Sequence, residues 1–197
     1  MNRLKFNKKT HTYEWRGVKI PSVTQIVKEV LTCGKNYYKD NGAREKGVLI
    51  HKLSVDVEKG KIDIDSIKEE YRGYLEAWLD FLYQYGINNI KEKDKMIEKK
   101  MMSRLMMIAG TPDRIYKRKD EIWIVDIKTG TDDEKMMRMQ LVGYGLILEE
   151  KERGKDIRIM DVFLKENGEW KLKEYPYNDR NKKIFKSFVN VFYYKKK

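Results

Sequence analysis

The residues best suited to chemistry are an aspartate and a lysine two positions apart, Asp126 and Lys128, at the end of an apolar run. The run from residue 121 to residue 130 reads EIWIVDIKTG and is rich in residues that favour β-strands. Side chains of a strand alternate between its two faces, so Asp126 and Lys128 should point the same way. This stretch therefore predicts a strand that presents a carboxylate and an ammonium side by side.

A second candidate carboxylate, Asp113, follows another apolar stretch, Leu105 to Ala109, after a break at Gly110-Thr111-Pro112. Two carboxylates that neighbouring strands bring together repel each other unless a cation lies between them. Mg²⁺ favours one or two carboxylates together with waters and phosphate oxygens. A lysine beside such an ion can position or deprotonate an attacking water. The pattern therefore predicts metal-assisted hydrolysis of a phosphodiester.

The composition indicates one globular domain with a basic surface. The chain has 197 residues, of which 41% are hydrophobic, and is long enough to bury a core. Lysine and arginine total 43 against 31 acidic residues, and the net charge of +12 suits a polyanion such as DNA. We expect a single domain over residues 1–197, with a hairpin and short helix in 1–42, the core in 43–165, and a strand and helix in 166–197.

The cysteine count excludes several classes of site. Cys33 is the single cysteine, so an intrachain disulfide, a four-cysteine zinc site and a cysteine-ligated iron–sulfur cluster are all ruled out. No apolar run approaches the roughly 20 residues of a membrane span, and the N-terminal segment lacks the apolar part of a signal peptide. We therefore expect a cytoplasmic protein. Cys33 as a nucleophile is the less favoured alternative.

The elements that must position the site follow from periodicity and turn residues. A hairpin that turns at Arg16-Gly17 is expected over residues 11–20, followed by a helix that the capping box Ser22 to Gln25 opens and that runs to about Leu31. Further helices are expected at about 43–58, 66–85, 133–150 and 181–194, the last capped by Asp179. Strands are expected at 95–102, 105–116, 121–128, 157–165 and 169–175. This order predicts an α/β fold around a mixed central sheet.

Two residues outside the strand motif are candidates for the site. His51 shares one face of the helix at 43–58 with Arg44 and Gly47. A histidine on an apolar helix is more often a core residue, but close to carboxylates it becomes a candidate metal ligand or neighbour. Glu98 lies in an expected strand, where its alternative role is that of a surface ion partner for a nearby lysine.

A further helix supplies two candidates of its own. Gln140 and Tyr144 lie four apart on one face of the helix at 133–150 and would reach the same pocket or the substrate. The methionines between Met101 and Met139 are expected to fill the core rather than bind a soft metal, because no cysteine supports them. The aromatic residues of the helix at 66–85 are also expected to be core, with a DNA groove as their alternative.

Taken together, these motifs resemble the PD-(D/E)XK nuclease superfamily, and most closely its RecB-type and phage exonuclease branch. The resemblance spans about residues 43 to 148 and rests on five blocks in order: Arg44-x-x-Gly47-x-x-x-His51, Glu98, Gly110-Thr111-Pro112-Asp113-Arg114-Ile115, Val125-Asp126-Ile127-Lys128-Thr129-Gly130, and Gln140-x-x-x-Tyr144. It implies a restriction-endonuclease-like core, in which a mixed sheet is flanked by helices, preceded by the N-terminal hairpin and helical region.

The resemblance also implies roles for the candidate residues. Asp113 and Asp126 would be the principal ligands of Mg²⁺ or Mn²⁺, with the carbonyl of Ile127, and His51 would bind or adjoin the ion. Lys128 would orient and activate the water, and Glu98 would support the metal site. The remaining candidates would bind or position DNA: Gln140, Tyr144, Arg44, Arg114 and Thr129.

The resulting expectation is a Mg²⁺-dependent deoxyribonuclease, a stand-alone exonuclease of phage or mobile-element type in replication, recombination or repair. DNA is the expected partner, with a single-strand annealing or replication protein as a further candidate, in a bacterial or phage-infected cell. The sequence contains no phosphate-gripping Gly-x-x-x-x-Gly-Lys-Ser/Thr loop, so it should not unwind DNA itself. Oligomeric state and polarity stay open.

Three alternatives remain from the residues alone. The same fold could serve a structure- or sequence-specific endonuclease, which circular DNA would distinguish from an exonuclease. A nucleic-acid-binding protein that does not cut is the alternative from another functional class, and salt-sensitive binding without products would favour it. The third alternative is an unrelated basic protein in which Asp126 and Lys128 form a surface ion pair.

Overall fold

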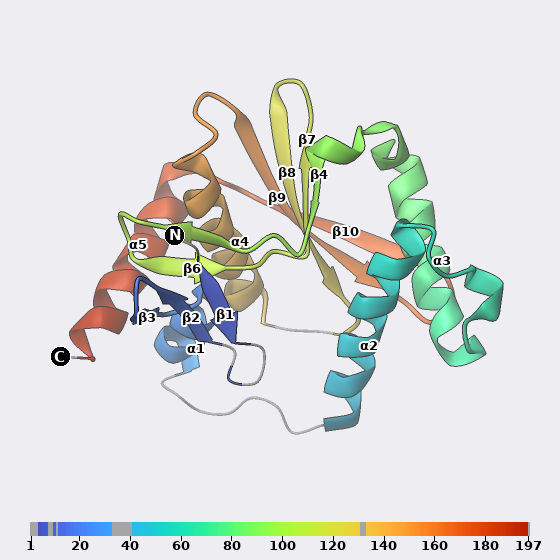
Figure 1. Ribbon diagram of the computed structural model, residues 1–197, viewed down its shortest axis with the longest axis horizontal. Helices are drawn as coiled ribbons and strands as arrows, with labels where there is room; N and C mark the ends of the chain where they lie inside the picture. Colours follow the sequence, from blue (N-terminus) through green and yellow to red (C-terminus); the bar gives the residue numbers. More distant parts are fainter. Residues whose placement is uncertain (1–3, 8–9, 11, 33–40, 131–132, 197) are drawn as a thin grey trace.

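The computed structural model describes residues 4–7, 10, 12–32, 41–130 and 133–196 (Figure 1). The start of the expected hairpin at His11 and the single cysteine, Cys33, lie outside the described residues. None of the described helices is long and apolar enough to cross a membrane.

A five-stranded mixed sheet occupies the centre of the molecule (Figure 1), in the order β10-β9-β8-β7-β4. Its strands are β4 (Lys95–Ile97), β7 (Arg114–Lys117), β8 (Glu121–Lys128), β9 (Asp156–Leu164) and β10 (Trp170–Tyr175). Strands β8 and β9 are parallel, so the chain must cross over between them, and a helix makes that crossing. The other neighbours are antiparallel. The expected α/β class with a mixed sheet is confirmed.

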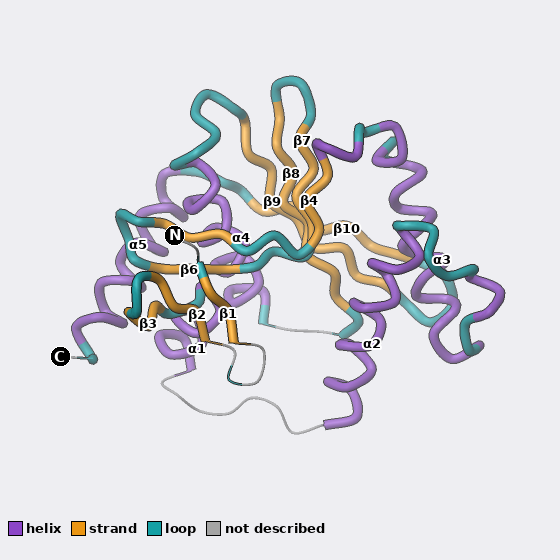
Figure 2. The backbone as a smooth tube through the Cα atoms, viewed as in Figure 1, coloured by secondary structure: helices purple, strands orange, loops and turns teal. Residues whose placement is uncertain are grey.

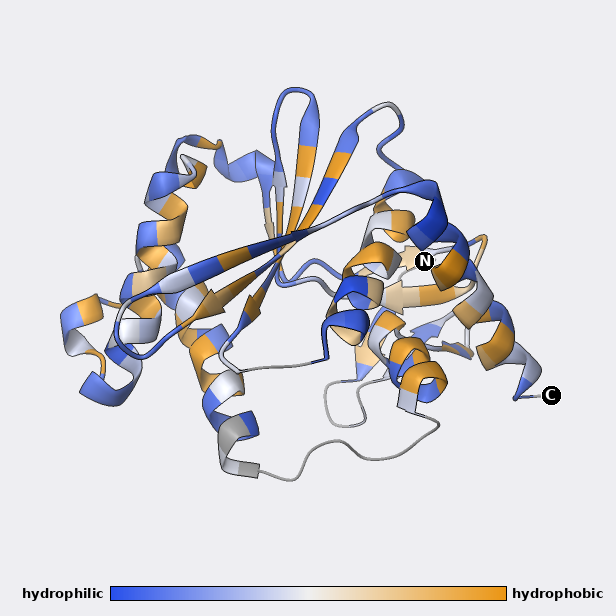
Figure 3. Ribbon diagram, turned by 180° about the vertical axis from the view of Figure 1, so that it is seen from behind, coloured by the Kyte–Doolittle hydropathy of each residue, from blue (hydrophilic) through white to orange (hydrophobic). Residues whose placement is uncertain are grey.

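Two layers of helices cover the two faces of this sheet (Figure 2). One layer contains α2 (Asn41–Glu58) and α3 (Glu69–Gln84), and the other contains α1 (Val23–Thr32), α4 (Glu134–Glu149) and α5 (Asp179–Tyr194). Strand β8 supplies both cores, because Ile122 and Ile124 face the α1–α4–α5 layer whereas Trp123, Val125 and Ile127 face the other. Apolar residues accordingly gather where helices meet the sheet (Figure 3).

A smaller β structure lies beside the main sheet. Strands β1 (Lys5–Asn7), β2 (Thr12–Trp15) and β3 (Val18–Ile20) form one antiparallel sheet, and β5 (Met101–Ser103) pairs with β6 (Ile108–Gly110) in another. The expected turn of the hairpin is confirmed: Arg16 and Gly17 both have positive φ, 51° and 79°, as a two-residue hairpin loop requires. The two small sheets share one cluster of buried side chains.

Two of the expected strands, 95–102 and 105–116, are each divided in two. The chain leaves β4 at Glu98, whose φ is +48°, and enters β5 in a different sheet. The expected strand 105–116 is likewise divided into β6 and β7, separated by Thr111-Pro112-Asp113. Proline lacks the N–H that a central strand needs, so the break at Pro112 has a local cause. The bend at Glu98 lies where the chain passes from the five-stranded sheet to the two-stranded sheet. The spacing of apolar residues does not reveal such a passage.

The helix ends agree with the expected capping signals in part. Ser22 Oγ accepts a hydrogen bond from the Gln25 N–H at 3.0 Å, as the capping box predicts for α1. Asn178, rather than the expected Asp179, caps α5 by accepting from the Asn181 N–H at 3.0 Å. The helix expected from residue 66 begins at Glu69, because residues 64–66 form a separate 3-10 turn, η1. Two more such turns, η2 (Ile87–Asn89) and η3 (Glu92–Asp94), precede β4.

The cores are filled as expected. Met101, Met102, Met137 and Met139 are buried among aliphatic and aromatic residues, which confirms them as core residues. On α3, Tyr74, Trp78 and Phe81 are likewise buried against the sheet.

A substitution at Gly73 should test the packing of α3 on the β9–β10 connection. A Cβ atom at residue 73 would lie 1.7 Å from a backbone carbonyl oxygen of that connection, at Glu166. Gly73→Ala should therefore lower the free energy of unfolding by about 1–3 kcal/mol, despite the better helix propensity of alanine. Urea denaturation measures this loss. Glu76→Ala, at an exposed position of the same helix, is the control, and equal midpoints for both variants would contradict the packing.

Candidate active site

The register of the central sheet lines up four acidic residues. Strand β7 pairs Arg114 with Val125 of β8, so the adjoining residues Asp113 and Asp126 lie opposite each other. Strand β9 pairs Asp161 with Asp126. The β4–β7 register pairs Ile97 with Arg114 and continues to place Glu98 beside Asp113, whose carbonyl accepts the Glu98 N–H at 2.9 Å. Directly paired residues within strands, here Asp126 and Asp161, project from the same face of the sheet.

Asp113 is held between α2 and β8. Its Oδ2 lies 3.2 Å from His51 Nδ1 and accepts the Ile127 N–H at 2.8 Å. Burial raises the pKa of the Asp113 carboxyl, but the His51 side chain and the Ile127 N–H outweigh burial and lower this pKa to about 2. Asp113 is therefore a carboxylate near neutral pH, with its position fixed by a helix and a neighbouring strand.

His51 carries a raised pKa for the complementary reason. Burial lowers the pKa of its imidazole, and the adjacent Asp113 carboxylate raises it by more. The expected convergence of a helix histidine with the strand carboxylates is present in the structure.

Asp126 and Lys128 form a close ion pair on the face of β8 that carries Ile122 and Ile124. Lys128 Nζ lies 2.7 Å from Asp126 Oδ2, and both side chains are largely buried, with exposures of 12% and 7%. Burial raises the pKa of Asp126, and the Asp113 carboxylate adds to that rise. The two carboxylates are thus close enough to repel each other.

The charge state of Lys128 limits what it does chemically. Burial lowers the pKa of its ammonium, but the carboxylates of Asp126 and Asp161 raise it by more, so that the pKa lies above the ordinary value. Lys128 is therefore a cation near neutral pH. It can donate hydrogen bonds and stabilise negative charge, but in this state it cannot take a proton from water.

Glu98 does not bring its carboxylate into this group. Its side chain is exposed, and its positive φ follows from the bend at which the chain leaves β4. Only its backbone N–H contacts the site, through the Asp113 carbonyl. We therefore correct its expected role: the bend helps to hold Asp113, whereas the carboxylate points to solvent.

Arg114 is buried and does not reach a DNA backbone, in contrast to its expected role. It is 1% exposed, and its Nε donates to Glu58 Oε2 at 2.6 Å. Its other nitrogens donate to Ser54 Oγ and to the Asp113 carbonyl, both at 3.0 Å. Arg114 therefore ties α2 to the strand that carries Asp113, and its task is to position that strand.

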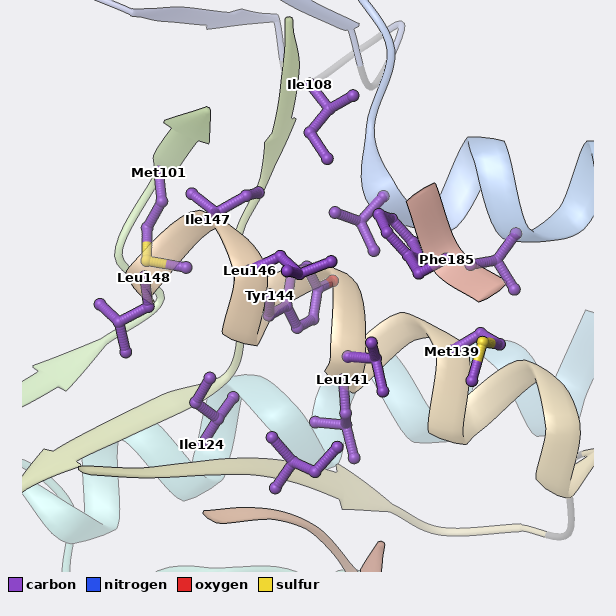
Figure 4. Close-up of a cluster of buried hydrophobic side chains, with 14 of the residues drawn as sticks. Met101, Ile108, Ile124, Met139, Leu141, Tyr144, Leu146, Ile147, Leu148 and Phe185 are labelled. Carbon is purple, nitrogen blue, oxygen red and sulfur yellow. The ribbon is translucent and has the colours of Figure 1, made fainter. Parts of the chain in front are cut away.

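Tyr144 is also an interior residue. It is 4% exposed and packs within the α1–α4–α5 core (Figure 4), and burial raises the pKa of its hydroxyl. Its ring lies against Gly110, where a Cβ would come within 2.5 Å of a ring carbon, so glycine is required just before the Asp113 segment. Gln140 Nε2 donates to the Tyr144 hydroxyl at 3.1 Å. Tyr144 thus contacts Gln140 and packs against the start of the Asp113 segment from inside the core. A buried side chain in this position supports the site, in contrast to the direct contact with DNA that we expected.

The two remaining candidates, Arg44 and Thr129, lie nearer the surface. Arg44 is exposed in the first half of α2, and Thr129 follows the end of β8. A Cβ at Gly47 would lie 3.2 Å from Thr129 Oγ1, so the glycine allows α2 to approach the loop after β8. This approach explains why a glycine stands between Arg44 and His51.

Sequence analysis missed Asp161. This residue is fully buried on β9, and neither carboxylate oxygen has a hydrogen-bond partner among the described residues. Burial raises its pKa to about 7, and the neighbouring Asp126 carboxylate contributes to that rise. A sequence signal existed: Ile157, Ile159 and Asp161 alternate on one face of the strand, so an acid stands where the pattern requires an apolar residue.

The donors of this site fit a hard divalent cation. Within the described ranges, no group of three or more acidic, histidine or cysteine side chains is arranged to hold a metal ion. Mg²⁺ does not require one, because it is commonly held by one or two carboxylates and keeps several waters. The two carboxylates Asp113 and Asp126, which repel each other across neighbouring strands, provide such a pair of ligands.

Comparisons with known proteins identify a family. The family profile of the PD-(D/E)XK nuclease superfamily matches residues 32–191. No curated protein matches the chain.

Two solved structures are weakly similar to this chain. A protein described as a "Putative exonuclease" from Eubacterium rectale is 10% identical, with a TM-score of 0.45, over 83% of this chain and 68% of that one. A second, SSO0001, is 13% identical, with a TM-score of 0.34, over 85% and 84%. Both TM-scores are below 0.5, so the family assignment rests on the profile match.

A substitution at Arg114 should separate a positioning role from DNA binding. Arg114→Met leaves the buried Glu58 carboxylate without its partner, which should lower the free energy of unfolding by about 3–5 kcal/mol. The double variant Arg114→Met/Glu58→Leu should recover part of this loss, because neither charge then remains. Thermal or urea denaturation measures both.

Lys165→Met is the matched control for Arg114→Met, because it removes one member of an exposed ion pair and should change stability little. If Arg114→Met is as stable as the unaltered protein but binds DNA more weakly, Arg114 contacts DNA and does not position the strand.

Proposed function

We propose that this chain, which belongs to the PD-(D/E)XK nuclease superfamily, is a metal-dependent DNA nuclease. It would act as a stand-alone exonuclease of phage or mobile-element type, in replication, recombination or repair. The observation that carries the proposal is the convergence of Asp113, Asp126 and Lys128 from adjacent strands, with His51 against Asp113. These are the types of side chain that hydrolysis of a phosphodiester requires.

Asp113, Asp126 and the carbonyl of Ile127 would hold the divalent ion, Mg²⁺ or Mn²⁺, with His51 next to it. A bound ion of this kind polarises the phosphate and lowers the pKa of a coordinated water. The chain's own contribution is to fix the two carboxylates, because His51 and the Ile127 N–H hold Asp113 in its place.

Lys128 acts as a fixed positive charge in this proposal. Its ammonium would donate hydrogen bonds that orient the attacking water and stabilise the negative charge that grows on the phosphate oxygens. Its raised pKa favours this role over proton abstraction.

Arg44, Thr129 and Gln140 are the proposed contacts to the DNA backbone. Arg44 is exposed, and the other two are partly exposed. The net charge of +12 would add long-range attraction, which weakens as the salt concentration rises.

Replacement of the central residues should abolish cleavage without unfolding the protein. Asp113→Asn, Asp126→Asn and Lys128→Met should each lower the rate of DNA hydrolysis in Mg²⁺ by at least about a hundredfold, because each removes a charge that the transition state needs. The rate of release of acid-soluble nucleotides measures the effect, and EDTA should stop the reaction of the unaltered protein.

Asp156→Asn is the matched control for these variants, because it removes a carboxylate from the other end of β9, where the side chain is exposed. Its rate should equal that of the unaltered protein. Salt-sensitive DNA binding with no products under any metal would instead identify a binding protein on the nuclease fold.

The form of the DNA substrate should separate an exonuclease from an endonuclease. The preference for an exonuclease rests on the motif order that ends in Gln140-x-x-x-Tyr144. Linear duplexes labelled at the 5′ or 3′ end should be degraded from an end, whereas covalently closed circles should stay intact. Gel electrophoresis reports both, and linearisation of the circles would make the protein an endonuclease.

A further inference from the structure

Asp161 is the most unusual charged residue outside the proposed catalytic set. It lies in the middle of β9, is fully buried, and has two carboxylate oxygens without a hydrogen-bond partner among the described residues. A buried carboxylate without a partner is costly, so such residues are rare unless a cation or a donor is available to them.

The sheet determines which groups face Asp161. On one side the β8–β9 register places Asp126 opposite it, and on the other the β9–β10 register places Lys173 opposite it. Lys173 is engaged elsewhere, because its Nζ lies 2.6 Å from Glu134 Oε2. The Tyr175 hydroxyl lies close enough to Asp161 for a hydrogen-bond interaction that lowers the pKa of the carboxyl, but the two groups do not meet in regular hydrogen-bond geometry.

Among the described residues, Lys128 is a second cation near Asp161. It lies two residues beyond Asp126 on β8 and therefore on the same face of the sheet, diagonal to Asp161 across the two strands. A lysine side chain is long enough to span such a diagonal. The attraction between the two groups is large enough to contribute to the pKa of each.

The present pairing of Lys128 conflicts with the proposed use of Asp126. Lys128 Nζ is bonded to Asp126 Oδ2, an oxygen that a divalent ion at this carboxylate would attract as well. Lys128 is 12% exposed. If Asp126 binds a divalent ion, the buried Lys128 ammonium would therefore be left without a carboxylate partner, which is energetically costly. A second carboxylate within reach removes that difficulty.

We propose that Asp161 is a positioning residue, which accepts the Lys128 ammonium when Asp126 binds a divalent cation and so keeps Lys128 beside the reaction centre. The inference rests on the proposed metal-dependent function. In it, Lys128 alternates between two buried carboxylates on neighbouring strands, Asp126 and Asp161, and Asp161 never touches the ion or the DNA.

A double-mutant cycle on metal affinity tests this proposal without measuring catalysis. Isothermal titration calorimetry would give the Mn²⁺ affinity of the DNA-free protein for the unaltered chain, Asp161→Asn, Lys128→Met and the double variant. Asp161→Asn should weaken Mn²⁺ binding about tenfold, because Lys128 then has only Asp126 as its partner and competes with the ion. In the Lys128→Met background the same substitution should have less than about a twofold effect.

The cycle distinguishes positioning from simple long-range attraction. If Asp161 only attracts the ion by its charge, Asp161→Asn weakens binding equally in both backgrounds, and the proposal is overturned. Asp156→Asn, which removes a charge from the exposed end of the same strand, should leave the affinity unchanged. If Asp161→Asn does not fold, as judged by circular dichroism, Asp161→Ser serves in the same cycle.

The failure of this proposal differs from the failure of the proposed function. Absence of Mn²⁺ binding by the unaltered protein would refute the metal-dependent function and this inference together. Binding by the unaltered protein with equal effects in the two backgrounds would refute the role of Asp161 alone.

Discussion

The pairing register of three adjacent strands is the constraint on which the rest of the structure depends. It sets Asp113, Asp126 and Asp161 side by side across β7, β8 and β9. Such a row is electrostatically unfavourable, and the structure offsets it with a lysine, a histidine and a backbone N–H placed among the carboxylates. A shift of one residue in the β7–β8 or the β8–β9 pairing would move a carboxylate to the opposite face of the sheet, so the carboxylates would no longer lie together.

The two helical layers maintain that register from opposite sides. On one side, Arg114 and Glu58 join β7 to α2, and the same helix brings His51 to Asp113. On the other side, α4 places Tyr144 against Gly110, where the chain enters the Asp113 segment. The geometry of the carboxylates thus depends on buried residues that do not contact a substrate.

The same arrangement determines the chemistry that Lys128 can perform. A lysine acts as a base only where its surroundings lower its pKa, and two neighbouring carboxylates do the reverse. In the proposed reaction, the fixed charges would therefore stabilise a developing anion, while activation of water would be left to a bound ion. A surplus of basic residues elsewhere on the chain suits a polyanionic substrate without altering this local balance.

The sequence by itself determined the α/β class and most helices and strands, and it predicted Asp113, Asp126, Lys128 and His51 as site residues, because periodicity and motif spacing are local properties. Only the tertiary structure decided that Glu98 turns to solvent, that Arg114 and Tyr144 are interior supports, and that Asp161 joins the row. Exposure and cross-strand neighbours depend on which distant segments pair and pack. No local pattern encodes that pairing, although the acid on the apolar face of β9 gave a sign of it.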